Sequence, residues 1–169
     1  MLTEKDIPMG ITTAMCNTFK QELLGGVHDL DTDTLKIALI KASPTDDYGA
    51  GTKSYDGASD TGNGESLTQG NNDEATATQG TYTAGGNVLS GVTISLSTTD
   101  GRAYVDISNE LFSSLSISAD GALLYNASQG NKAIAVFAFT TTVTSTNGDF
   151  TVIFPAVGAE GVDAVIRIS

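Results

Sequence analysis

The fold class is decided by residues 92–107, which read VTISLSTTDGRAYVDI. Apolar and polar side chains alternate over 92–96 and again over 103–107, which is typical of β-strands that bury one face. Asp100-Gly101 lies between the two runs and is a strong signal for a two-residue turn. We therefore predict an antiparallel β-hairpin over this stretch.

A similar alternation extends the sheet toward the C-terminus. The further strands that we expect there cover residues 115–126, 133–144, 150–154 and 162–168. Asp120-Gly121 is either a second turn or a bulge within one long strand, and Asn147-Gly148 predicts a turn between two strands. Several strands joined by short turns favour a sandwich or a jelly roll.

The N-terminal part of the chain contributes one helix. Met15, Phe19 and Leu23 recur at a spacing of four, which predicts a short amphipathic helix over 13–24. Gly25-Gly26 follows and supplies the left-handed residue that ends many helices.

One strand and one arm complete the expected elements. Residues 35–42 read as a strand with one buried face. Residues 1–11 are expected to form an N-terminal arm, because Pro8 and Gly10 disfavour a helix there. Residues 12–169 are expected to form a single domain, because a chain of 169 residues is enough for one sizeable core.

A long polar stretch, residues 43–87, interrupts this pattern. It contains seven acidic residues and one lysine, and small polar residues dominate it, which predicts a long loop excursion. Such a composition cannot build a core of its own, so we predict that the excursion and the arm contact a neighbouring subunit. The side chains expected to make that contact are Met1, Leu2, Ile7, Tyr48, Tyr55, Leu67 and Tyr82. Burial of the four excursion side chains against the domain itself is the alternative.

The composition agrees with a β fold. The chain contains 23 Thr, 15 Ser and 19 Gly, and only 17% of its residues are charged. Thr favours strands and Gly favours turns, whereas a helical bundle needs Ala, Leu, Glu and Lys in bulk. We therefore predict a mainly β protein, an antiparallel β-sandwich of jelly-roll type with one short N-terminal α-helix.

The net charge of −12 argues against two classes of partner. Binding to nucleic acid depends on Lys and Arg, and this chain has eight such residues against twenty acidic ones. An anionic membrane repels the same charge, and no apolar run approaches the roughly 18 residues that a bilayer requires. No secretory signal is visible, so the acceptor pattern Asn126-Ala127-Ser128 is not expected to carry a glycan.

No catalytic constellation is recognisable in the sequence. His28 is the only histidine, and no Gly-x-Ser-x-Gly elbow accompanies it, so we interpret it as a structural residue near a helix end. Cys16 falls on or beside the apolar stripe, where a thiol more often packs than reacts. We predict no enzyme activity, no catalytic residue and no cofactor. A glycan hydrolase with two carboxylates on different strands stays open, because spacing cannot reveal such a pair.

Acidic residues suggest calcium at two places. Residues 29–33, DLDTD, resemble the start of an EF-hand loop, but Thr34 and Ile40 stand where that loop needs Gly and Glu. We interpret the motif as a solvated acidic turn and predict no metal site. A calcium site of another kind in the excursion, around Asp46-Asp47 or Asp73, stays open.

Three blocks of the chain carry a resemblance to a known family. They are residues 13–26 (TAMCNTFKQELLGG), 82–86 (YTAGG) and 121–126 (GALLYN). These blocks resemble structural proteins encoded among the virion genes of tailed bacteriophages. The resemblance covers most of the chain apart from the arm and much of 43–80, and the acidic excursion is longer than in that family. It implies a particle component that is made in the cytoplasm of the bacterial host.

The resemblance and the composition together lead to a capsid decoration, or cement, protein. Such a protein binds the outer surface of the capsid and bridges neighbouring subunits of the major capsid protein. A homo-oligomer, dimer or trimer, is expected, because multivalent attachment multiplies weak contacts. The alternatives are a phage tail or head–tail connector component and a carbohydrate-binding adhesin module.

Overall fold

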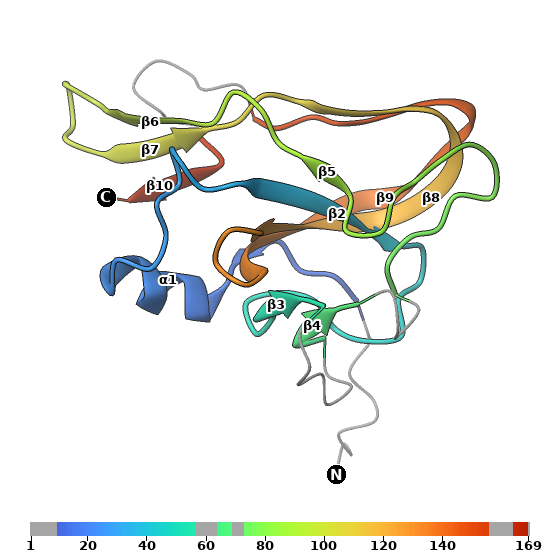
Figure 1. Cartoon of the computed structure of the whole chain (residues 1–169), viewed down its shortest axis with the longest axis horizontal. Coiled ribbons are helices and arrows are strands. Elements are labelled where there is room, and N and C mark those ends of the chain that lie inside the picture. The colour runs from blue at the N-terminus through green and yellow to red at the C-terminus, as the bar shows by residue number, and fades with distance from the viewer. Residues whose placement is uncertain (1–9, 57–63, 69–72, 156–163, 169) are drawn as a thin grey trace, which may run out of the picture.

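The computed structural model describes residues 10–56, 64–68, 73–155 and 164–168. Over these ranges the chain is mainly β, with one helix, which confirms the predicted fold class at that level (Figure 1). The elements are β1 (Ala14–Met15), α1 (Asn17–Leu24), β2 (Leu35–Lys41), β3 (Ser54–Tyr55), β4 (Ser66–Leu67), β5 (Asn87–Val88), β6 (Thr93–Leu96), β7 (Ala103–Asp106), β8 (Glu110–Asn126), β9 (Lys132–Val152) and β10 (Ile166–Ile168).

The strands form two sheets. The large sheet has seven strands in the order β4-β3-β9-β8-β2-β5, with β1 also paired to β9. It is mixed, because β3 and β4 run parallel while its other strand pairs are antiparallel. The small sheet is antiparallel, with the order β10-β7-β6, and lies at the same end of the molecule as α1 (Figure 1).

The β8–β9 hairpin runs through the large sheet and bends in its middle, so that its two halves lie over one another (Figure 1). At the bend, Asp120 of β8 alone faces residues 139–142 of β9. The Asp120 carboxylate accepts hydrogen bonds from the Thr142 hydroxyl at 2.6 Å and from the Ser43 N–H at 2.8 Å. Against β2, Ile40 pairs with Gly121 and Lys41 with Ala119, so Asp120 is an extra residue in the continuous strand β8. Asp120-Gly121 is therefore a bulge within one long strand, and the turn alternative is wrong.

Two predicted turns differ in the structure. Asn147-Gly148 does not turn the chain, because β9 runs through it and Asn147 adopts the left-handed conformation of a bulge, with φ 49°. The Asn147 N–H donates to the Ser116 hydroxyl oxygen at 2.8 Å, which holds the bulge against β8. The β6–β7 hairpin is confirmed, but its loop has four residues, 98–101, because the ladder continues one pair beyond the two strands.

Helix α1 begins later than the apolar stripe predicts. Residues 14–15 form β1 instead, which pairs with β9, and the helix starts at Asn17. The Cys16 N–H donates to the Ile134 carbonyl at 2.9 Å and extends that ladder by one bond. The left-handed residue expected after the helix is Gly26, with φ 68°.

Strand β2 is buried on both faces, although its alternation predicts one buried face. Its fully buried side chains are Leu35, Ile37, Ala38, Leu39 and Ile40. The excursion contributes to the same core, because residues 73–75 run along β2: the Lys41 N–H donates to the Asp73 carbonyl and the Ala75 N–H to the Leu39 carbonyl, both at 2.8 Å. The described part of the excursion is therefore packed on the large sheet.

The predicted arm is also shorter than 1–11. Gly10 and Thr12 exchange backbone hydrogen bonds with Tyr48, which brings residues 10–12 into the body. Residues 1–9 lie outside the described ranges, as do 162–163 of the last predicted strand. No helix in the described ranges has both the length and the apolar character needed to cross a membrane.

Candidate functional site

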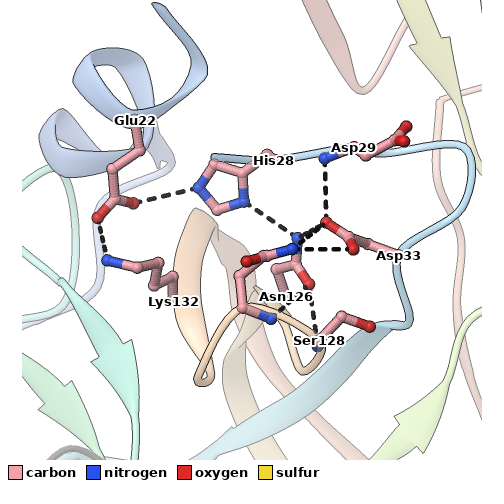
Figure 2. Close-up of polar contacts among 8 residues, drawn as sticks. Glu22, His28, Asp29, Asp33, Asn126, Ser128 and Lys132 are labelled. Carbon is pink, nitrogen blue, oxygen red and sulfur yellow. Dashed lines mark hydrogen bonds and ion pairs between the residues drawn. The ribbon is translucent and has the colours of Figure 1, made fainter. Parts of the chain in front are cut away.

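His28 lies in a polar cluster between α1 and the loop end of the β8–β9 hairpin (Figure 2). Its Nε2 is 3.1 Å from Glu22 Oε2, and its Nδ1 is 3.0 Å from the side-chain nitrogen of Asn126. Because an amide nitrogen only donates, Nδ1 accepts and Nε2 carries the proton that His28 donates to Glu22. The imidazole side chain is fully buried and packs on Phe19, with ring centroids 5.0 Å apart.

Asn126, the last residue of β8, orients this cluster. Its side-chain oxygen accepts from the backbone N–H of Ser128 at 3.0 Å and of Gln129 at 3.2 Å, which turns its nitrogen toward His28. The same nitrogen donates to the Asp33 carboxylate at 2.6 Å. Since Asn126 is fully buried and its amide is bonded at both ends, it cannot accept a glycan.

Glu22 joins the helix to the hairpin. It forms an ion pair with Lys132, which lies 110 residues away in the chain, and accepts the hydrogen bond from His28 (Figure 2). Burial raises the pKa of the Glu22 carboxyl, but the bonds from Lys132 and His28 outweigh it and hold that pKa below its ordinary value. The cluster therefore keeps a carboxylate that ties α1 to the start of β9.

His28 and Cys16 are both enclosed by other parts of the fold. Glu22 and Asn126 occupy both ring nitrogens, and among the described residues no hydroxyl or thiol is hydrogen-bonded to the ring. The Cys16 Sγ lies 3.8 Å from the Gly49 carbonyl oxygen, and burial raises the pKa of its thiol to about 12. A cysteine nucleophile needs its thiolate, and this burial disfavours the thiolate of Cys16.

A second cluster surrounds Glu74, which is buried. Its carboxylate accepts from the Tyr55 hydroxyl at 2.8 Å, the Tyr82 hydroxyl at 3.0 Å and the Gly85 N–H at 2.6 Å. Burial raises the pKa of Glu74, although these three donors oppose the shift. Tyr125 closes the cluster, since its hydroxyl donates to the Gly85 carbonyl at 2.8 Å and its ring stacks on Tyr55.

The adjacent carboxylate of Asp73 is fully buried as well. It pairs with Lys41 Nζ at 2.9 Å and accepts from the N–H and hydroxyl of Thr45, the N–H of Asp46 and the hydroxyl of Tyr48. Burial raises the pKa of Asp73, but these donors hold it below its usual range. Its oxygens face protein donors, and within the described ranges no three His, Cys, Asp or Glu side chains gather where they could hold a metal ion.

The structure places the four predicted contact residues of the excursion in the core. Three of them are buried and the fourth packs partly buried against the same cluster; they are Tyr48, Tyr55, Leu67 and Tyr82. The tyrosine hydroxyls bond to the two buried carboxylates, which turns the rings inward. Their assignment as partner contacts is therefore corrected to core packing. The remaining three, Met1, Leu2 and Ile7, lie outside the described residues.

Exposed apolar side chains remain on the half of the β8–β9 hairpin that lies beyond the bend from its loop. This distal half comprises residues 110–119 and 143–153. Val143 is 42% exposed and Ile153 is 75% exposed. Both line a shallow groove that also contains Phe139 and Phe150 and has no charged residue in its wall.

A second exposed apolar surface lies on the small sheet, one face of which is entirely apolar. Paired residues on neighbouring strands point to the same face, and the register forms two rows: Ile94, Val105 and Ile166 in one, Leu96, Ala103 and Ile168 in the other. Leu23 and Leu30 cover part of this face and leave a cavity of about 100 Å³. The cover is incomplete, because half or more of Ile94, Leu96 and Ile168 stays exposed.

No protein-family model, curated protein or solved structure matches the chain. Two of the three sequence blocks quoted above meet in the structure. Block 82–86 supplies Tyr82 and Gly85 to the Glu74 cluster, to which block 121–126 adds Tyr125. The sequence reasoning missed Glu74, because its donors Tyr55, Tyr82 and Gly85 lie 8 to 19 residues away and no local pattern marks them.

Proposed function

We propose that this chain is a non-enzymatic structural protein of a tailed-phage virion, which decorates the outer surface of the capsid and cements it by bridging major capsid protein subunits. The observation that carries the proposal is the distribution of reactive and apolar side chains. His28, Cys16 and two carboxylates are used inside the fold, whereas apolar side chains stay exposed on two surfaces. Exposed apolar patches on an otherwise polar chain mark protein–protein contacts.

The charge supports a place on the outside of the shell. Four basic residues already pair with carboxylates of this chain; they are Lys41, Lys53, Arg102 and Lys132. The net charge of −12 thus leaves a surplus of acidic groups, which packaged DNA repels.

We assign the shell contact to the distal half of the β8–β9 hairpin. Its groove is uncharged, is lined by Phe139 and Phe150, and exposes Val143 and Ile153. Aromatic pockets without charge are typical of the centres of protein interfaces. The finer fold prediction, an antiparallel sandwich of jelly-roll type, belongs to the same proposal and is supported by the overlying halves of the bent hairpin (Figure 1).

Copy number tests the proposal at the level of the particle. Quantitative mass analysis of purified virions should give several hundred copies, because a decorating protein follows the repeated subunits of the shell. A count of about six or twelve would instead favour the tail or connector alternative, whose rings have low closed symmetry.

Rebinding to particles that lack the protein tests the surface. The double variant Val143→Ser/Ile153→Ser should lose most of its occupancy on the shell while keeping the circular dichroism spectrum of the parent. Leu24→Ser is the matched control, because Leu24 is 93% exposed at the end of α1, away from the bend (Figure 1). Full occupancy of the double variant would move the contact elsewhere, and deletion of residues 1–9 then tests Met1, Leu2 and Ile7.

A further inference from the structure

The small sheet ends at β6, and the outer edge of this strand has backbone groups without a described partner. The Ser97 N–H donates to the Arg102 carbonyl at 2.8 Å, so Ser95, two residues earlier, also faces β7. Ile94 and Leu96 have the opposite parity and direct their N–H and C=O groups outward. Among the described residues, none is hydrogen-bonded to those groups.

Strand β6 also lacks the devices by which proteins usually protect an edge. The segment Thr93–Leu96 has neither a charged residue nor a proline, and its ladder with β7 is regular. It belongs to the longest uncharged run of the chain, residues 75–99, in a sequence with eight basic and twenty acidic residues. Two copies of a chain with net charge −12 repel one another over most of their surfaces, and this edge is where they can approach.

We propose that two copies of this chain pair through β6, antiparallel and about a two-fold axis that passes beside Ser95. Antiparallel pairing of one strand with itself is self-complementary, so the same edge serves both copies. With the axis at Ser95, Ile94 lies opposite Leu96 of the partner subunit, and the two residues exchange both backbone hydrogen bonds. The two small sheets become one sheet of six strands.

The pairing covers apolar side chains that are exposed in one copy. Ile94 is 50% exposed and Leu96 is 66% exposed, and both point to the apolar face of the small sheet. Across the axis Ile94 packs on Leu96 of the partner subunit, which joins the apolar rows of the two copies. The strand contributes four residues from each copy, so the interface is small and the dimer dissociates on dilution.

This inference does not rest on the capsid assignment. The dimer forms from purified protein alone, and its absence would leave the copy number and the hairpin groove untouched. Where the protein does decorate a shell, two linked copies bind with higher avidity than one, provided that both reach their sites.

A cysteine at the axis tests the register. Ser95→Cys places two thiols in a non-hydrogen-bonded pair, where the Cα atoms are about 4.5 Å apart and a disulfide can form. Under mild oxidation we expect a covalent dimer on a non-reducing gel, without competition from the fully buried Cys16. Thr93→Cys is the control, because its two copies lie roughly 13 Å apart in this register. Cross-linking of both variants, or of neither, contradicts the proposed pairing.

Self-association in solution tests the edge itself. Sedimentation velocity should show a monomer–dimer equilibrium that Leu96→Lys weakens at least ~10-fold. Val88→Lys makes the same charge change at a side chain of β5 that is 58% exposed, and it should leave the equilibrium unchanged. Added salt should strengthen the dimer, because it screens repulsion between two acidic chains. A monomer at every concentration and salt, or a dimer that Leu96→Lys does not weaken, overturns the proposal.

Discussion

The large sheet and the small sheet have the same alternation of apolar and polar residues but differ in how their apolar side chains are covered. In the large sheet, both faces of β2 are buried, and Ile37 is fully enclosed. In the small sheet, Leu23 and Leu30 cover only part of one apolar face, and Leu96 stays 66% exposed. The large sheet holds the fold, and the small sheet leaves apolar side chains exposed at the edge where we propose that a second copy pairs.

The largest effect is expected where the excursion approaches the large sheet. Gly86 has φ 65°, and a Cβ added there would lie 1.8 Å from the Ile37 carbonyl oxygen. Gly86→Ala should therefore lower the free energy of unfolding by about 4 kcal/mol or more, measured by denaturant titration. Gly130→Ala is the control: Gly130 has φ 68° with open space around it, so that variant should lose only about 1 kcal/mol.

A slightly smaller effect on the free energy of unfolding is expected from the two buried carboxylates, Asp73 and Glu74. Their contributions to stability should change with pH in opposite directions. The folded-state pKa of Asp73 is held below its ordinary value of 3.8, so its contribution to stability is present above that pH and is lost as the pH falls. The pKa of Glu74 is raised above 4.5, so the native state favours the protonated form and loses stability as the pH rises from 4.5 through the raised value.

Two conservative variants separate these contributions. Asp73→Asn should cost about 3 kcal/mol at neutral pH, because Lys41 loses its buried partner, and the loss should shrink in acid. The free energy of unfolding of Glu74→Gln should rise relative to that of the parent protein as the pH increases above 4.5. Unfolding free energies measured across the acid range check both signs, and parallel curves for the two variants would contradict the opposite shifts.

A moderate effect is expected in the His28 cluster. His28→Ala removes the donor to Glu22 and the acceptor for Asn126, so it should cost about 2 kcal/mol. Cys16→Ser should cost about as much, because a hydroxyl is more costly than a thiol to bury at a site that is fully enclosed. Both variants should keep their occupancy on the shell at temperatures where they stay folded. Loss of a specific turnover in a folded variant would instead point to an enzyme.

The strands were predictable because period two is a local property. Strand β2 was found from alternation, and the β6–β7 hairpin was found from alternation and the Asp100-Gly101 turn signal. The bend of the β8–β9 hairpin was not found. Asx-Gly pairs supply a left-handed residue both to turns and to bulges. The pair Asn147-Gly148 is therefore compatible with either structure, and its sequence does not distinguish them. The difference lies in partners far along the chain, such as Ser43, which bonds to Asp120 from 77 residues away.

The polar clusters were not predictable for a related reason. The composition of the excursion predicts a solvated loop because its residues are small and acidic. Asp73 and Glu74 are nevertheless buried, by donors that other parts of the excursion supply. Tyr125 reaches the Glu74 cluster from 40 residues beyond Gly85. Composition shows which groups are polar, but it does not show which donors are hydrogen-bonded to each carboxylate. Those hydrogen bonds decide whether a carboxylate is buried or exposed.

The smallest effect is expected on the small sheet. Leu96→Ala should change the free energy of unfolding by no more than about 0.5 kcal/mol in dilute solution, because Leu96 is 66% exposed and leaves no cavity. Ile37→Ala removes a side chain of the same size from the buried strand and should cost about 2–5 kcal/mol. At high protein concentration the cost of Leu96→Ala should grow, because dimer formation stabilises the parent by mass action. A concentration-independent difference between parent and variant would mean that β6 faces only solvent.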